Sequence, residues 1–218
     1  DKSVSRGLGD VYKRQHGSNR LGGNGVANST VYGGVAGDVM GQDCQEMEAL
    51  HDPDETVLEE ELTRAMTPFS QKPGDVTALR NRLQDVMWED VGVMRDADGL
   101  QRGLKRIAEI DDELSSVGVA ADNLAFNLSW HDWLNLRSLV DMSMVIAKAA
   151  LSRENSRGAH FREDFPDAGA MQESYFTLAS GYGDAISVTR APVQFTIVKP
   201  GETLLGEDEA KTLIKAAQ

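Results

Sequence analysis

Apolar residues in the middle of the chain recur every three or four positions, the spacing of one face of an α-helix. Asp75 can cap the first such helix, whose apolar positions are Leu79, Leu83, Val86, Met87 and Val91. The spacing repeats after Asp96-x-Asp98-Gly99, at Leu100, Leu104, Ile107 and Leu114. A third, longer helix is expected from about 122 to 152, with Leu124, Leu128, Leu136, Leu139, Met142 and Ile146 inside. Three such helices predict an antiparallel bundle and a mainly α fold.

The segments on either side of this region follow other patterns. Residues 173–201 contain two or three β-prone runs separated by 181–184, which predicts a hairpin or small antiparallel ribbon, and 207–218 suggest a short polar helix. Residues 16–41 are a polar glycine loop followed by small and apolar residues, as expected of a loop that leads into a tightly packed helix. Asn24 can cap that helix, and its expected buried positions are Val26, Val31, Val35 and Val39. The acidic stretch 42–54 is expected to be a linker.

Composition narrows the class of protein. The 218 residues are 40% hydrophobic and 26% charged, as expected of a soluble globular chain. Its 35 acidic and 22 basic side chains give a net charge of −13, which disfavours a nucleic-acid partner. The single cysteine, Cys44, cannot form an internal disulfide, and no cysteine–histidine cluster suggests a metal site. No apolar run approaches the roughly 20 residues of a membrane span, so we expect a cytoplasmic protein with no direct membrane span.

The loop from His16 to Asn24 carries the clearest chemical signal. Its glycines can bring backbone N–H groups against a ligand, and the helix that follows presents the positive end of its dipole there. Within the loop, Arg20 offers a guanidinium fork for a carboxylate. An ordinary tight turn with a surface arginine has the same spacing, so the residues alone leave both interpretations open.

Three segments resemble the flavoprotein subunits of succinate dehydrogenase and fumarate reductase, a superfamily that includes L-aspartate oxidase. The segment at 16–24, HGSNRLGGN, resembles the family's HGANRLGGN. The segment at 156–166, SRGAHFREDFP, is similar to the family's SRGAHxREDFP, and MWEDVGVMR at 87–95 resembles its helix end before a Gly-Leu start. The resemblance covers roughly residues 16–166.

This resemblance implies a domain organisation. Residues 16–54 would be the last segment of an α/β FAD-binding domain plus a linker, 55–166 the helical C-terminal domain, and 167–218 a β ribbon and C-terminal helix. Residues 1–15 do not match and are expected to be a non-family tail. Because no G-x-G-x-x-G strand–turn–helix precedes His16, we expect the chain to be the C-terminal portion of a longer flavoprotein.

The resemblance also implies roles for individual residues. Arg20 matches the arginine that grips a carboxylate of the C4 dicarboxylate substrate beside the flavin, where hydride passes to or from N5. Gly25 and Val26 match the pair whose backbone contacts FAD, and Asn24 and His16 are expected beside the same cofactor site. No catalytic residue is expected within this chain. The implied partner is an iron–sulfur or other electron-transfer subunit, which could attach the protein peripherally to the inner face of the membrane.

Other interpretations remain open. The chain could be a non-catalytic helical docking module for an electron-transfer partner, or part of an L-aspartate oxidase-like enzyme. The cluster of Arg157, His160, Arg162 and Asp164 could be an acid–base site, but a structural ion-pair network is favoured. Likewise, the 130–133 segment, Trp-His-Asp-Trp, is more typical of a packed aromatic seam than of a catalytic dyad, and Asp96-x-Asp98-Gly99 of a helix cap than of a calcium loop.

Overall fold

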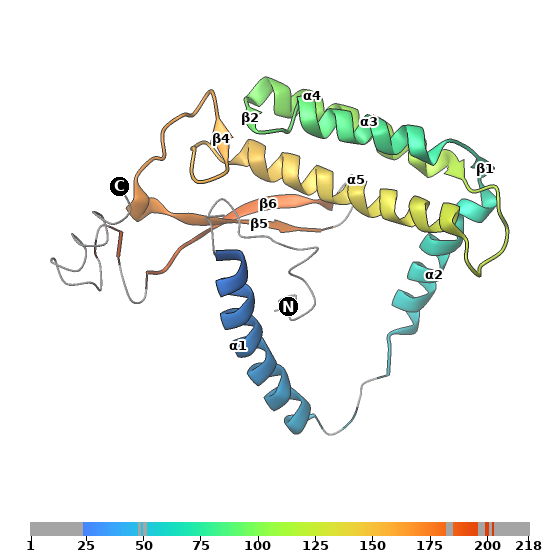
Figure 1. Ribbon diagram of the computed structural model, residues 1–218, viewed down its shortest axis with the longest axis horizontal. Helices are drawn as coiled ribbons and strands as arrows, with labels where there is room; N and C mark the ends of the chain where they lie inside the picture. The colour runs from blue at the N-terminus through green and yellow to red at the C-terminus, as the bar shows by residue number, and fades with distance from the viewer. Residues whose placement is uncertain are drawn as a thin grey trace.

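The computed structural model describes residues 24–47, 49, 52–181, 185–195, 199, 200 and 202. Helices make up most of this part of the chain, which confirms a mainly α fold (Figure 1). The helices are α1 (Asn24–Glu46), α2 (Glu55–Ser70), α3 (Val76–Glu89), α4 (Ala97–Ser116), α5 (Leu128–Ser152) and the short 3₁₀ helix η1 (Met171–Glu173). The strands are β1 (Lys72–Pro73), β2 (Met94–Arg95), β3 (Val117–Gly118), β4 (Phe161–Arg162), β5 (Tyr175–Ser180) and β6 (Ser187–Pro192).

Helices α3, α4 and α5 form the predicted antiparallel bundle (Figure 1). Their directions follow from two short strand pairs at the ends of the bundle. At one end, β1 before α3 pairs with β3 after α4, and at the other end β2 between α3 and α4 pairs with β4 after α5. The start of α3 therefore lies beside the end of α4, and α4 runs opposite to both of its neighbours.

Side-chain caps fix where the bundle helices begin. Asp75 accepts a hydrogen bond from the backbone N–H of Ala78 at 2.9 Å, and Asp96 accepts one from Gly99 at 2.6 Å. Both caps confirm the sequence predictions, and the Asp96 segment is a helix start. Each such cap satisfies a donor that the first turn of a helix cannot pair internally, and replacing one with alanine typically costs about 1 kcal/mol.

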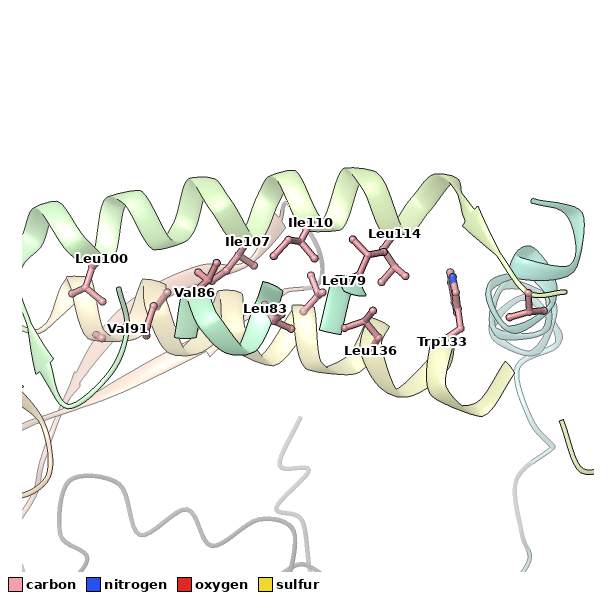
Figure 2. Close-up of a cluster of buried hydrophobic side chains, with 14 residues drawn as sticks. Leu79, Leu83, Val86, Val91, Leu100, Ile107, Ile110, Leu114, Trp133 and Leu136 are labelled. Carbon is pink, nitrogen blue, oxygen red and sulfur yellow. The ribbon is translucent and has the colours of Figure 1, made fainter. Parts of the chain in front are cut away.

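The core lies between α3, α4 and α5 (Figure 2). The predicted positions of α3 and α4 point into it, and Met87 and Leu104 are half-buried against it. From these two helices and the turn between them the buried apolar side chains are Leu79, Leu83, Val86, Val91, Leu100, Ile107, Ile110 and Leu114. Leucine and isoleucine side chains at such positions stabilise a fold by about 2 to 5 kcal/mol each relative to alanine.

Helix α5 differs from its prediction. It begins at Leu128, about six residues later than expected, and Leu136 is the only one of the six expected core residues that is buried. The exposed ones are Leu124, Leu128, Leu139, Met142 and Ile146. The stripe that packs on α3 and α4 consists instead of Trp133, Leu136, Val140, Ser143, Ala147 and Ala150. Three small residues at its C-terminal end let α5 approach its neighbours closely, which larger side chains would prevent.

The ribbon after the bundle confirms the β prediction. Strands β5 and β6 are antiparallel, with Tyr175 opposite Pro192 and Ser180 opposite Ser187. The ribbon packs on α5, and Arg153 and Arg190 lie over the ring of Tyr175 at 5.1 and 4.6 Å. The helix predicted at 207–218 lies outside the described residues.

Candidate functional site

Helix α1 contains the described part of the predicted cofactor site. Asn24, Gly25 and Val26 are its first three residues, so the backbone that the resemblance places against FAD forms a helix N-terminus. The side chain of Val26 is 76% exposed. His16 and Arg20, the other predicted site residues, lie outside the described residues.

The expectation that α1 buries its valines is wrong for this chain. Val26, Val31, Val35 and Val39 are all exposed, as are Tyr32 and Met40. A methyl group added at Gly33, Gly34, Gly37 or Gly41 would meet nothing within 4 Å. The small residues of α1 therefore do allow close approach, but no described part of the chain occupies that space. The helix also continues to Glu46, so the first residues of the predicted linker 42–54 are helical.

The electrostatics of α1 suit an electron-rich group at its N-terminus. Its first turn contains no acidic residue, and the helix carries no charged side chain before Asp38. The positive end of the helix dipole is therefore not opposed by the helix's own side chains. Such an end can hold a negatively charged group through its free backbone N–H donors.

In the segment after α5, SRGAHFREDFP at 156–166, Arg162 makes the central contacts. Its side chain is only 1% exposed, and its Nη1 donates to the carbonyls of Ala150, Leu151 and Arg153 at 3.1 to 3.2 Å. These carbonyls belong to the last turn of α5 and its cap, where the helix has no internal donors to offer. Arg162 therefore closes the C-terminus of the longest helix in the bundle.

Asp164 completes this contact and connects it to another helix. Its carboxylate accepts two hydrogen bonds from Arg162, at 2.7 and 2.6 Å, and one from the backbone N–H of Ala97 at 3.0 Å. Hydrogen bonding from Arg162 lowers the pKa of Asp164 to about 2. Because Ala97 begins α4, the Arg162–Asp164 pair ties the end of α5 to the start of α4.

His160 and Arg95 form a second buried contact in the same region. Arg95 Nη1 lies 2.9 Å from His160 Nδ1, and Arg95 Nε donates to the carbonyls of Val91 and Gly92. Since an arginine can only donate, Nδ1 must be the acceptor and the proton of the neutral ring sits on Nε2. Burial first, and then the positive charge of Arg95, lowers the pKa of His160 to about 4. A histidine held neutral by an arginine serves here to join β2 to the 156–166 segment.

Arg157 extends these contacts toward the ribbon. It donates to the carbonyls of Ala168 and Ala170 and to the hydroxyl of Ser174. Each of the four residues of the predicted cluster thus has a structural partner, but only Arg162 and Asp164 form an ion pair, so the predicted ion-pair network is confirmed only in part. The cluster holds helix ends together at one end of the bundle and presents no free acid–base pair.

The aromatic segment at the start of α5 is also structural. Trp133 is buried and donates from Nε1 to the carbonyl of Val117 at 2.7 Å. Trp130 packs against Phe69 with ring centroids 5.2 Å apart and donates to the carbonyl of Ala65. His131, between them, is exposed. This confirms the predicted aromatic seam, which attaches α2 to the bundle.

Sequence reasoning missed two ion-pair clusters of the bundle, one in which the buried Asp90 pairs with Arg102 and Arg106, and one around Arg137. Arg137 on α5 bonds to Asp141 at 2.8 Å and to Asp111 on α4. Hydrogen bonds to these carboxylates raise the pKa of Arg137 despite its desolvation, which is the largest single influence and acts in the opposite direction. The four-residue spacing of Arg137 and Asp141 was a visible signal, but only the packing of α4 on α5 brings Asp111 to them.

Comparison with known proteins identifies the family. Residues 80–204 match the family described as fumarate reductase flavoprotein C-term. An uncharacterised FAD-dependent oxidoreductase of Methanocaldococcus jannaschii is 35% identical over 161 residues, 73% of this chain. A subunit of the fumarate reductase (CoM/CoB) of Methanothermobacter marburgensis is 31% identical over 159 residues, also 73% of this chain. The chain therefore belongs to the fumarate reductase flavoprotein C-terminal family.

A solved structure supports the same assignment. A chain of the Mycobacterium smegmatis Sdh1 complex in the apo form aligns with a TM-score of 0.75 and 31% identity, and the alignment covers 92% of this chain. The match spans 34% of that chain and 28% of each of the two curated relatives. This protein thus corresponds to about a third of the length of the proteins that it resembles.

No helix in the described residues is long and apolar enough to cross a bilayer. The same part of the chain contains no group of three or more histidine, cysteine, aspartate or glutamate side chains placed to hold a metal ion.

Proposed function

We propose that this chain is the C-terminal portion of an FAD-dependent oxidoreductase that interconverts succinate and fumarate or a related C4 dicarboxylate. The family match over residues 80–204 carries the proposal. The names of the two curated relatives, an FAD-dependent oxidoreductase and a fumarate reductase subunit, agree with it. In this proposal the bundle is a scaffold, and the chemistry takes place at the N-terminal side of the chain.

The residues at the start of α1 fit the flavin. Asn24, Gly25 and Val26 would hold it through their backbone N–H groups, and the absence of an acidic side chain in the first turn leaves the helix dipole available. When bound there, FAD would supply hydride chemistry at N5. A helix N-terminus favours negative charge, so this contact would favour the reduced cofactor. His16 would lie beside the same site and has no proposed role in proton transfer.

Arg20 would bind the substrate. A guanidinium group is planar and always charged, and it can donate two parallel hydrogen bonds to one carboxylate. From its position four residues before α1 in the sequence, it would orient a dicarboxylate against the cofactor that the helix holds. Orientation of this kind can account for a large part of an enzyme's rate enhancement, because it removes the entropic cost of bringing two reactants together.

The family match also supports an electron-transfer partner. The Mycobacterium smegmatis relative is part of a complex by its own description. We therefore propose that the complete flavoprotein passes electrons to or from an iron–sulfur or other electron-transfer subunit. Through such a partner the protein would be peripheral at the inner face of the membrane, with its own domains in the cytoplasm.

The cofactor assignment is tested first with the 218-residue chain. Because it spans about a third of its relatives, the purified chain should retain no FAD after gel filtration. A chimera in which residues 16–218 replace the matching C-terminal part of the Methanocaldococcus jannaschii relative should retain FAD with its absorption band. A chimera that folds without retaining FAD would instead favour the docking-module interpretation.

The substrate assignment is tested by Arg20→Ala in the same chimera. Loss of a charged hydrogen bond to a carboxylate should lower kcat/KM for the dicarboxylate by about ten- to a hundredfold, while FAD remains bound. Arg20→Lys is the matched control, because it keeps the charge but loses the fork, and it should recover only part of the activity. Unchanged kinetics in Arg20→Ala would refute the assignment.

A further inference from the structure

Buried polar atoms without a hydrogen-bond partner gather just after α5. The described part of the chain has such atoms on four side chains, and three of them lie within eight residues: Arg153 Nε, Asn155 Oδ1 and His160 Nε2. Asn155 and His160 are only 6% and 7% exposed. Buried polar groups in folded proteins are almost always paired, with protein atoms, water or an ion. Three unpaired groups in one segment therefore indicate a bound partner.

The chain folds so that these residues lie in one region. Arg153 is the C-cap of α5, and Asn155 follows two residues later. The segment then turns back on itself, because Arg157 and His160 exchange backbone hydrogen bonds of 2.9 and 3.1 Å. Both the backbone carbonyl and the positive charge of Arg153 influence the pKa of His160, so the ring lies close to that residue.

The positive charge of this region is only partly balanced. Arg162 pairs with Asp164. Arg95 donates to two backbone carbonyls and contacts a histidine ring, and Arg153 donates to a hydroxyl. Neither of these two half-buried arginines contacts a carboxylate in the described residues, and the exposed Glu154 lies 3.9 Å from a different arginine. Burying a charge without a counter-ion is costly, and a bound anion would offset that cost.

We propose that this region binds a small monovalent inorganic anion such as chloride, held by Arg153 Nε and His160 Nε2. Both groups are N–H donors. The side-chain amide of Asn155 makes no hydrogen bond, so a half-turn that exchanges Oδ1 and Nδ2 breaks nothing and supplies a third donor. The deep burial of Asn155 and His160 favours a small ion over a larger oxyanion.

A water molecule is the main alternative ligand. One water could accept hydrogen bonds from Arg153 Nε and His160 Nε2 and donate one to Asn155 Oδ1. It would leave the charges of Arg95 and Arg153 without a counter-ion, and for that reason we favour the anion. The two ligands differ in charge, so salt composition distinguishes them.

The stability of the 218-residue chain tests the site. Thermal unfolding is followed by circular dichroism at constant ionic strength, while sodium chloride replaces sodium gluconate. A ligand that binds only the folded state stabilises it, so Tm should rise by at least about 3 °C as chloride reaches about 200 mM. Asn155→Asp places a carboxylate where the anion would lie. This variant should melt at a higher temperature than the unmodified chain in gluconate and should not respond to chloride.

Asn81→Asp is the matched control, because it makes the same replacement on the exposed side of α3 and should keep the chloride response. A bromide soak of crystals then locates the ion, which should give an anomalous peak within hydrogen-bond distance of Arg153 Nε and His160 Nε2. This peak and the response of the unmodified chain decide the matter even if Asn155→Asp does not fold.

Three results would overturn the proposal. A Tm that is independent of chloride, with a water and no anomalous peak at the site, would assign the site to water. A bromide peak without a chloride response would mark an adventitious ion only. An equal chloride response in Asn155→Asp would show that chloride acts elsewhere on the protein.

Discussion

Replacing Arg162 with methionine should destabilise the helical bundle more than any exposed charge removal. The side chain is 1% exposed and supplies donors to three carbonyls at the end of α5 and to the carboxylate of Asp164. Methionine has a similar length and no donors. The variant would therefore leave several acceptors unpaired in a site that water reaches poorly. It would also break the connection that runs from the end of α5 through Arg162 and Asp164 to Ala97.

The expected cost follows from that geometry. Breaking a buried ion pair by removing one partner typically costs about 3 to 5 kcal/mol. For a domain of this size, each kcal/mol lowers Tm by about 2 to 4 °C, so Arg162→Met should lower it by roughly 6 to 20 °C. Arg82→Met is the matched control: Arg82 pairs with Glu113 at 2.5 Å, but both side chains are about half exposed. Its loss should cost at most about 1 kcal/mol.

Urea unfolding of the 218-residue chain, followed by circular dichroism, measures both variants. A double-mutant cycle with Asp164→Asn then isolates the pair, because the asparagine removes the carboxylate that Arg162→Met leaves unpaired. The double variant should be less destabilised than the sum of the two single variants. If Arg162→Met costs no more than Arg82→Met, or if the two effects add, the pair does not hold α5 and α4 together as described.

Two further predictions concern stability. The folded-state pKa of His160 is lowered from 6.5 to about 4. The stability that the neutral side chain contributes is therefore fully present above pH 6.5 and is lost as the pH falls toward 4. Between pH 7 and pH 4.5, this residue should lower the free energy of unfolding, measured by denaturant titration, by at most about 3 kcal/mol. His160→Gln should remove that loss, and a loss of the same size in the variant would contradict the prediction. Asn127 caps α5, because its side-chain oxygen accepts a hydrogen bond from the backbone N–H of Trp130. Its side-chain nitrogen donates to the carbonyls of Ala121 and Asn123 in the preceding loop. Asn127→Ala should therefore cost about 2 kcal/mol, while Asn127→Asp should keep the cap and lose less; equal losses would show that the cap contributes little.

The accuracy of the helix predictions depended on what lies opposite the apolar stripe. On α4 the residues facing away from Leu100, Ile107 and Leu114 are mostly polar, so the period of 3.6 identifies a single buried face. On the C-terminal half of α5 two apolar stripes compete, and the one with the larger side chains, including Met142 and Ile146, is the exposed one. Periodicity cannot distinguish two such stripes, because both satisfy it.

Polar contacts were predictable from the sequence only where the two partners lie close together along the chain. Asp75 and Asp96 were predictable as caps because a cap acts on the backbone two or three residues along the chain. The partners of Arg162 and the contact of His160 with Arg95, 65 residues away, depend on how the segment after α5 packs against the helix ends at one end of the bundle. A sequence motif could mark that segment as polar and clustered, but not state which carbonyls and carboxylates it would bind.

By itself, the sequence determined the bundle helices, the caps of α3 and α4, and the ribbon, since these follow from the spacing of side chains and from contacts within a few residues. Its three motifs also indicated the family, and they placed the expected flavin and substrate contacts before the bundle. Tertiary structure alone decided which face of α5 is buried, how Arg162 and Asp164 join α5 to α4, and that the valines of α1 stay exposed in the described part of the chain. Those outcomes depend on close packing between segments far apart in the chain, where small residues such as Ala147 permit an approach that hydrophobicity alone does not specify.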